Sequence, residues 1–168
     1  MTKPRKLALI FAGAWGLTAC ATFHDPMQGY DSGPWCGIED SAARESDSRV
    51  VLFYVEKVDG QPIDQAWAAT SRYNQGRGFA VDPKPVIRNL PARRMRLTLV
   101  AQTYNGAPVL DLFRKDFVVR GEVDFVPQDQ TFYVVKGVLN ADHGKIWLAD
   151  QRTGAQVSPA VESATTSK

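Results

Sequence analysis

The chain has 168 residues, which suits a single domain with flanking segments. Its 20 Lys and Arg side chains and 18 Asp and Glu side chains leave a formal net charge of +2. So weak a balance argues against a nucleic-acid-binding protein.

The chain begins with a positive segment that is followed by an apolar run. Lys3, Arg5 and Lys6 precede residues 7–17, which carry no charge. A run of this length is typical of the apolar region of a signal peptide, and it is too short to cross a bilayer, which needs about 20 residues. We therefore expect an N-terminal signal helix and a signal peptide over residues 1–19.

The end of this segment, Leu17-Thr18-Ala19-Cys20, resembles the lipobox of bacterial lipoproteins. The resemblance implies cleavage between Ala19 and Cys20 and acylation of Cys20, so that the protein is held to a membrane without a transmembrane helix. Attachment of this kind lasts when two or more acyl chains are buried. Residue 21 is Ala rather than Asp, which in such lipoproteins implies the outer membrane. We expect the domain to face the periplasm.

Residues 20–49 are rich in Gly, Pro, Ser and Asp and show no lasting periodicity, so they are interpreted as a lipidated linker. Fully extended, such a linker reaches about 100 Å. Cys36 lies in this segment and has no second cysteine left once Cys20 is acylated. Three interpretations stay open for it: a buried inert thiol, a disulfide to another molecule, or a nucleophile.

From residue 50 the pattern changes to short β-branched and aromatic runs that are separated by turn residues. The clearest is 93–104, in which Met95, Leu97, Leu99 and Ala101 alternate with mostly polar residues, as in a strand with one buried face. Asn105-Gly106, a strong hairpin signal, follows it. Residues 63–74 fit either a strand or one or two helical turns. Further strands are expected at 50–57, 86–90, 109–119, 122–126, 131–140, 145–150 and 155–157.

Short strands at regular spacing, without a convincing long helix, predict an all-β fold. We expect an antiparallel β-sandwich of about 7–8 strands over residues 50–157, followed by a disordered tail at 158–168. The strand order is similar to that of immunoglobulin-like or transthyretin-like lipoprotein domains, a resemblance that implies a fold and transfers no site. It rests on Val58-Asp59-Gly60, Leu90-Pro91-Ala92, Tyr133, Gly144 and Thr153-Gly154.

One charge cluster is a candidate for binding anions or a partner: Arg88, Arg93, Arg94 and Arg96. The planar guanidinium group suits bidentate contacts to carboxylates and phosphates. The alternative is a solvated strand face that is paired with acids on the next strand, such as Asp111 and Asp116.

No catalytic motif, metal site or cofactor-binding pattern is found in the sequence. His24 and His143 lie far apart, and His143 is interpreted as a turn residue. The aromatic residues Trp67, Tyr73 and Phe79 are expected to pack in the core, and an exposed patch of them would suggest a contact surface.

We therefore expect a non-enzymatic binding or assembly module of the envelope. Its partners would be a membrane, held through the anchor, and an envelope protein, with no nucleic acid. The alternative is an envelope hydrolase or a sugar- or lipid-binding protein, which a cleft with converging acids would favour.

Overall fold

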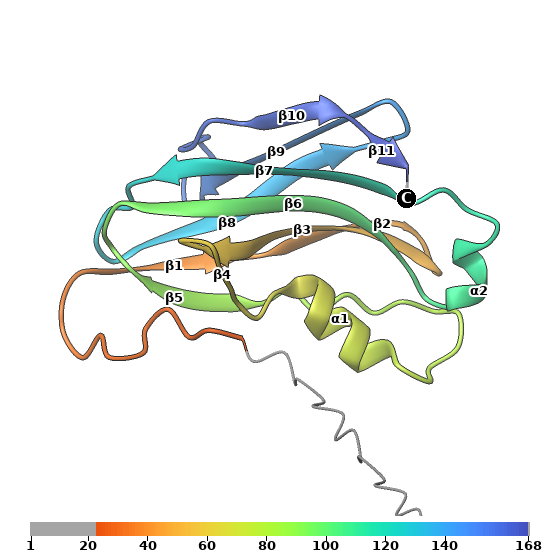
Figure 1. The fold of residues 1–168 in the computed structure, drawn as a ribbon, viewed down its shortest axis with the longest axis horizontal. Coiled ribbons are helices and arrows are strands. Elements are labelled where there is room, and N and C mark those ends of the chain that lie inside the picture. Colours follow the sequence, from red (N-terminus) through yellow and green to blue (C-terminus); the bar gives the residue numbers. More distant parts are fainter. Residues whose placement is uncertain (1–22, 168) are drawn as a thin grey trace, which may run out of the picture.

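The computed structural model describes residues 23–167, which form two β-sheets packed face to face (Figure 1). The β8 sheet has the order β10-β9-β8-β1-β5, with β10 at Val161–Ala164, β9 at His143–Asp150, β8 at Thr131–Leu139, β1 at Trp35–Glu39 and β5 at Ile87–Pro91. The β6 sheet has the order β11-β7-β6-β3-β2, with β11 at Thr166–Ser167, β7 at Phe117–Phe125, β6 at Met95–Asn105, β3 at Arg49–Val58 and β2 at Ser41–Ser46. A short strand, β4 at Gln61–Pro62, also pairs with β3.

The all-β sandwich expected from the sequence is confirmed. Eight strands have five residues or more, and every strand pair is antiparallel except β1 with β8. Two short helices are added, α1 at Ala66–Asn74 and α2 at Pro108–Asp111. Neither of these described helices is long and apolar enough to cross a membrane.

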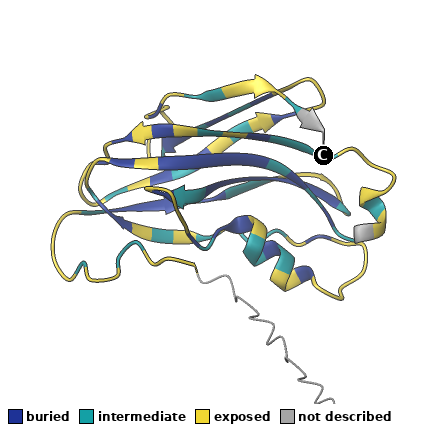
Figure 2. Cartoon of the chain, viewed as in Figure 1, coloured by how far each residue is buried: buried dark blue, intermediate teal, exposed yellow. Residues whose placement is uncertain are grey.

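The main core lies between the sheets, and the strands that form it carry most of the buried residues (Figure 2). The inward face predicted for β6 is confirmed, because Met95, Leu97, Leu99 and Ala101 are all 2% exposed or less. From the β8 sheet, Ile38, Leu90, Ile146 and Leu148 pack against them. The prediction of a single buried face is wrong, because Thr98 and Val100 on the other face are buried too.

A second apolar cluster lies on the outer face of the β6 sheet, under α1. It contains Val50, Leu52, Tyr54, Ala66, Val81 and Val100. Strand β3 is therefore buried on both faces, which explains why its sequence is a nearly continuous apolar run instead of an alternating one.

Two expectations about the flanks are corrected. Residues 35–46, expected within the linker, form β1 and β2, and β1 lies between β8 and β5 in the interior of its sheet. Part of the expected tail forms β10. Strand β1 pairs with β5 and β8, far along the chain, whereas β2 and β10 pair with their neighbours β3 and β9. All three strands have six residues or fewer, so no repeated pattern within them indicates strand structure.

The hairpin expected at Asn105-Gly106 is confirmed in its pairing, because β7 returns antiparallel to β6, but the tight turn is wrong. The chain forms α2 and a loop there, and the return strand β7 begins only at Phe117. It then continues through Gly121, where a break was expected. A Cβ atom on Gly121 would come within 2.5 Å of a Val161 methyl carbon, so this glycine permits close packing of β10 on β7.

Candidate binding pocket

The structure does not gather the four predicted arginines into one face. Arg88 lies on β5 of the β8 sheet, whereas Arg93, Arg94 and Arg96 lie at the start of β6. Arg93 donates to Asp59 at 2.9 Å. The cluster is therefore divided between the two sheets.

Arg96 follows the alternative interpretation, a strand face paired with acids, but with different partners. Its Nε lies 3.5 Å from Asp124 and its Nη1 lies 3.8 Å from Glu122, both on the neighbouring strand β7. Cross-strand pairs between exposed side chains stabilise a sheet only weakly. Asp111 and Asp116, the partners suggested by the sequence, lie between β6 and β7, where both accept from Asn105.

Arg88 belongs to a buried ion pair. Its guanidinium donates to Asp40, whose carboxylate also accepts from the amides of Val55 at 3.1 Å and Ala66 at 2.8 Å. Burial raises the pKa of Asp40 to about 6, while Arg88 and the two amides act in the opposite direction. This pair joins β5, β3 and α1, so its role is structural.

The other candidate groups from the sequence have ordinary places in the fold. Cys36 is fully buried in β1, and burial raises the pKa of its thiol to about 12, which keeps it protonated and unreactive at neutral pH. His143 is exposed at the start of β9, where its amide donates to Asn140 Oδ1 at 2.8 Å. In the described part of the chain, no three His, Cys, Asp or Glu side chains are placed to hold a metal ion. Cys20 and Ala19 lie outside the described residues.

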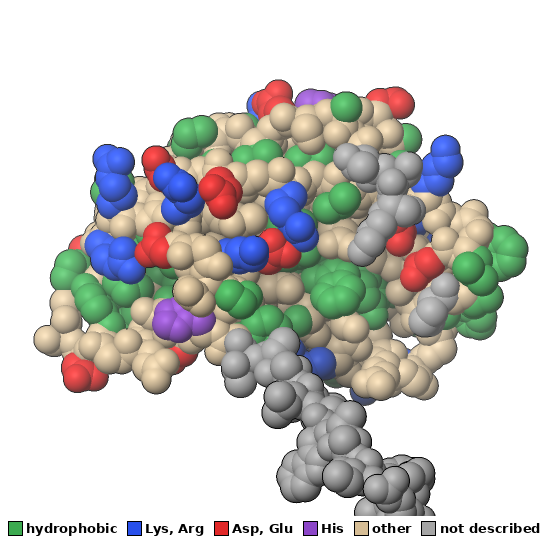
Figure 3. Space-filling view, in the orientation of Figure 1, with side chains coloured by type: hydrophobic (Ala, Val, Ile, Leu, Met, Phe, Trp, Pro, Cys, Tyr) green, Lys and Arg blue, Asp and Glu red, His purple; other side chains and the backbone are tan. Residues whose placement is uncertain are grey.

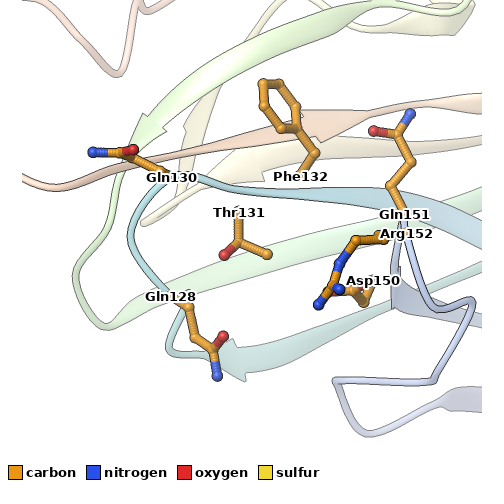
Figure 4. A pocket seen from close by; sticks show the side chains of 7 residues that line it. All are labelled: Gln128, Gln130, Thr131, Phe132, Asp150, Gln151 and Arg152. Atoms are coloured by element: carbon orange, nitrogen blue, oxygen red, sulfur yellow. The ribbon is translucent and has the colours of Figure 1, made fainter.

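A polar pocket of about 420 Å³ lies at the end of the sandwich where β7 leads into β8 and β9 ends (Figure 4). Thr131 lies above Gln128 in this view, with Arg152 and Asp150 to its right. The lining side chains are mostly amides and other hydrogen-bonding groups, with one aromatic ring: Gln128, Gln130, Thr131, Phe132, Asp150, Gln151 and Arg152.

The loop that forms this pocket is held by hydrogen bonds. The amide of Gln130, in a left-handed conformation with φ of 51°, donates to Trp35 O at 2.6 Å. The amide of Gln128 donates to the Tyr133 hydroxyl at 2.8 Å. The amide of Trp35 in turn donates to Asp129 Oδ1 at 2.9 Å. The polar groups are therefore presented on a fixed backbone, as a binding site requires.

The aromatic ring in the pocket is also held in place. Phe132 lies over Gly37, where a Cβ atom would come within 2.3 Å of the ring, and the Trp35 and Phe132 rings pack edge to face with centroids 5.6 Å apart. The Phe132 side chain is still 44% exposed. One face of the ring is thus supported by the sheet, and apolar surface stays open to a ligand.

The two charged groups of the pocket carry opposite signs. Asp150 accepts hydrogen bonds from the amide and hydroxyl of Thr153, and these lower the pKa of its carboxyl. Asp150 is therefore ionised, and Arg152 balances it. The pocket as a whole suits a neutral ligand with donors, acceptors and one apolar face.

A second cleft, of about 380 Å³, lies between α1 and α2 and contains two converging acids. Asn105 Nδ2 donates to Asp111 and to Asp116, each at 2.8 Å. The Trp67 and Tyr104 rings, 6.4 Å apart, form the apolar side. Sequence reasoning missed this arrangement because it placed both acids on a regular strand.

The polar pocket was missed for a different reason. Gln128 and Arg152 lie in two separate gaps between the predicted strands, and nothing in the local sequence shows that these gaps meet at one end of the sandwich. The composition of the turns, polar but without a motif, was the only available signal.

No protein-family model, curated protein or solved structure matches this chain. A function is therefore inferred from the pocket geometry and the N-terminal sequence.

Proposed function

We propose that this chain is an acylated lipoprotein of the bacterial envelope that acts as a non-enzymatic binding module. The observation that carries the proposal is the polar pocket, which three glutamines line together with an exposed, supported phenylalanine ring. Loops at the end of a β-sandwich are a common place for binding, because the sheets hold them rigidly.

The chemistry of the pocket fits a neutral glycan best. Each glutamine amide both donates and accepts hydrogen bonds, as hydroxyl and N-acetyl groups of a sugar require. The CH groups on one face of a sugar ring can pack on Phe132. This assignment combines the binding module expected from the sequence with the sugar-binding alternative.

The expected anchor at Cys20 supplies the second part of the proposal. An acylated chain is confined to one leaflet, which raises its effective concentration for a ligand or an envelope protein beside that leaflet. The outer membrane, with the domain in the periplasm, is the proposed location.

Titration of the purified protein with soluble N-acetylated oligosaccharides tests the pocket. Truncation of a central aromatic contact usually costs more than about 1.4 kcal/mol, so Phe132→Ala should weaken binding at least about tenfold. Val138→Ala is the matched control, because Val138 lies on the same strand and face and is 53% exposed outside the pocket. Equal affinity of native protein and Phe132→Ala, or no binding by the native protein, would contradict the proposal.

A second candidate, an envelope hydrolase, is favoured by the convergence of Asp111 and Asp116. Paired carboxylates are the groups that most glycoside hydrolases use. The same oligosaccharides, incubated with the protein, should then yield new reducing ends, and Asp111→Asn should abolish their release. Recovery of intact glycan supports binding without hydrolysis.

A further inference from the structure

The loop between β6 and β7 exposes large apolar side chains. Leu112 is 79% exposed, Phe113 is 80% exposed and Val109 is 46% exposed. We call these three residues the apolar tip. Figure 3 shows hydrophobic side chains gathered at this end of the molecule, around α2. Adjacent exposed apolar residues of this size mark contact surfaces more often than scattered single ones do.

The apolar tip is held by hydrogen bonds on both sides. Arg49 Nη2 donates to Lys115 O at 2.7 Å, and Arg114 Nη1 donates to Ser48 Oγ at 3.1 Å. On the inner side, Asn105 fixes Asp111 as described above. The exposure of Leu112 and Phe113 is therefore built into the loop.

Basic groups border the apolar tip. Arg114 and Lys115 follow it directly and are exposed. The one exposed acid within residues 109–115, Asp111, accepts a hydrogen bond from Asn105 Nδ2. The neighbouring loop adds Arg77 and Phe79, the latter 60% exposed, and it touches the first loop because a Cβ on Gly106 would come within 2.1 Å of Phe79 O. A projecting apolar centre with a cationic border matches an anionic lipid surface, where side chains enter the acyl region and cations meet phosphates.

We propose that the apolar tip inserts into an anionic lipid bilayer, with Arg114 and Lys115 at the phosphate level. The presence of a bilayer beside the domain rests on the proposed function. Strand β7 begins beside the tip and ends beside the polar pocket, and its nine residues span about 30 Å (Figure 1). Insertion would therefore point the pocket away from the membrane.

Vesicle sedimentation with a chain of residues 21–168 tests insertion independently of acylation, since this chain lacks Cys20 yet keeps both sheets and their core. We expect it to bind vesicles of phosphatidylglycerol and phosphatidylcholine. Leu112→Ser combined with Phe113→Ser should lower the partition coefficient at least about 100-fold, from the apolar burial lost. The matched control, Ile87→Ser with Val138→Ser, changes side chains that are 63% and 53% exposed on the β8 sheet, and it should bind like the native chain.

The basic border is tested with charge reversal. Arg114→Glu combined with Lys115→Glu should weaken binding at least about tenfold on anionic vesicles, and added salt should weaken binding of the native chain. Failure of the native chain to bind would overturn the inference, as would equal binding by the tip variant. Self-association that the tip variant abolishes would overturn it too, because the tip would then meet a second copy. Mass spectrometry of the native protein separately decides whether Cys20 is acylated.

Discussion

Asp40 shows at the scale of one residue how the two sheets are joined. It lies between β1 and β2, where the chain passes from the β8 sheet to the β6 sheet. Its side chain is fully buried and binds two backbone amides as well as Arg88. A carboxylate in this place can be satisfied only by these partners, so its ionisation is coupled to folding.

The raised pKa of Asp40 predicts a specific pH dependence of stability. Between about pH 4 and pH 6 the folded state binds a proton at Asp40 that the unfolded state has lost, so the contribution of Asp40 to stability falls as pH rises. At 1.36 kcal/mol per pH unit, the fall is about 3 kcal/mol. Asp40→Asn lacks this titration, so the free energy of unfolding of the native protein, relative to the variant, should decline by this amount.

Urea unfolding of both proteins from pH 4 to pH 7 measures this difference. The comparison cancels the exposed carboxylates with lowered pKa values, such as Asp150 and Glu162, whose contributions change in the opposite direction. A relative stability that rises with pH would contradict the prediction and show that attraction to Arg88 outweighs burial.

At the scale of elements, α1 depends on an unusual cap. Gln65 is 8% exposed, and its side-chain oxygen accepts from the amides of Trp67 at 2.6 Å and Ala68 at 3.2 Å. The helix that begins there covers the outer face of the β6 sheet. Glutamine is not a usual N-cap residue, so the sequence left residues 63–74 open between strand and helix.

Removal of this cap should therefore destabilise the fold. Gln65→Ala leaves two amide groups of the first helical turn without their acceptor, which costs about 1 kcal/mol. Urea denaturation measures the loss. The control is Gln75→Ala, which changes an exposed residue just beyond the other end of α1. Equal stability of the two variants would mean that the cap contributes nothing.

The elements that could be predicted from the sequence are those whose own residues show a regular apolar periodicity. In β6 apolar residues alternate from Met95 to Ala101, so the strand and its inward face could be predicted. The burial of Val100 on the other face depends on α1, which the sequence left open. In β1 only two inward side chains, Cys36 and Ile38, flank Gly37, and their burial comes from distant partners. The polar pocket likewise depends on where separate turns meet, which tertiary packing decides.

At the scale of the whole molecule, the segment expected to be a long linker is part of the folded body. The amide of His24 donates to Pro62 O at 2.8 Å, and the Arg72 guanidinium lies 5.9 Å from the centroid of the Phe23 ring. Only two residues, Ala21 and Thr22, separate Cys20 from Phe23, so three Cα–Cα steps join them. They span about 10 Å at most, instead of the expected 100 Å. An acyl group on Cys20 would hold the sandwich directly at the bilayer.

The anchor and the apolar tip would then both keep the folded body at the membrane. A spacer between Cys20 and Phe23 distinguishes the effect of one contact from that of the other. A flexible Gly-Ser insertion of about 20 residues before Phe23 has an average reach of about 25 Å. With the apolar tip intact, the body should stay at the surface. With Leu112→Ser and Phe113→Ser added, it should move away.

Energy transfer from a fluorophore at Gln28→Cys to a dye on lipid headgroups measures this distance in reconstituted vesicles. The label is specific because Cys36 is buried and Cys20 is expected to be acylated. Transfer should fall only in the protein that carries both the spacer and the tip variant. A fall with the spacer alone would show that the tip does not hold the membrane. If the protein with both the spacer and the tip variant kept the transfer efficiency of the native protein, a surface other than the tip would hold the body at the membrane.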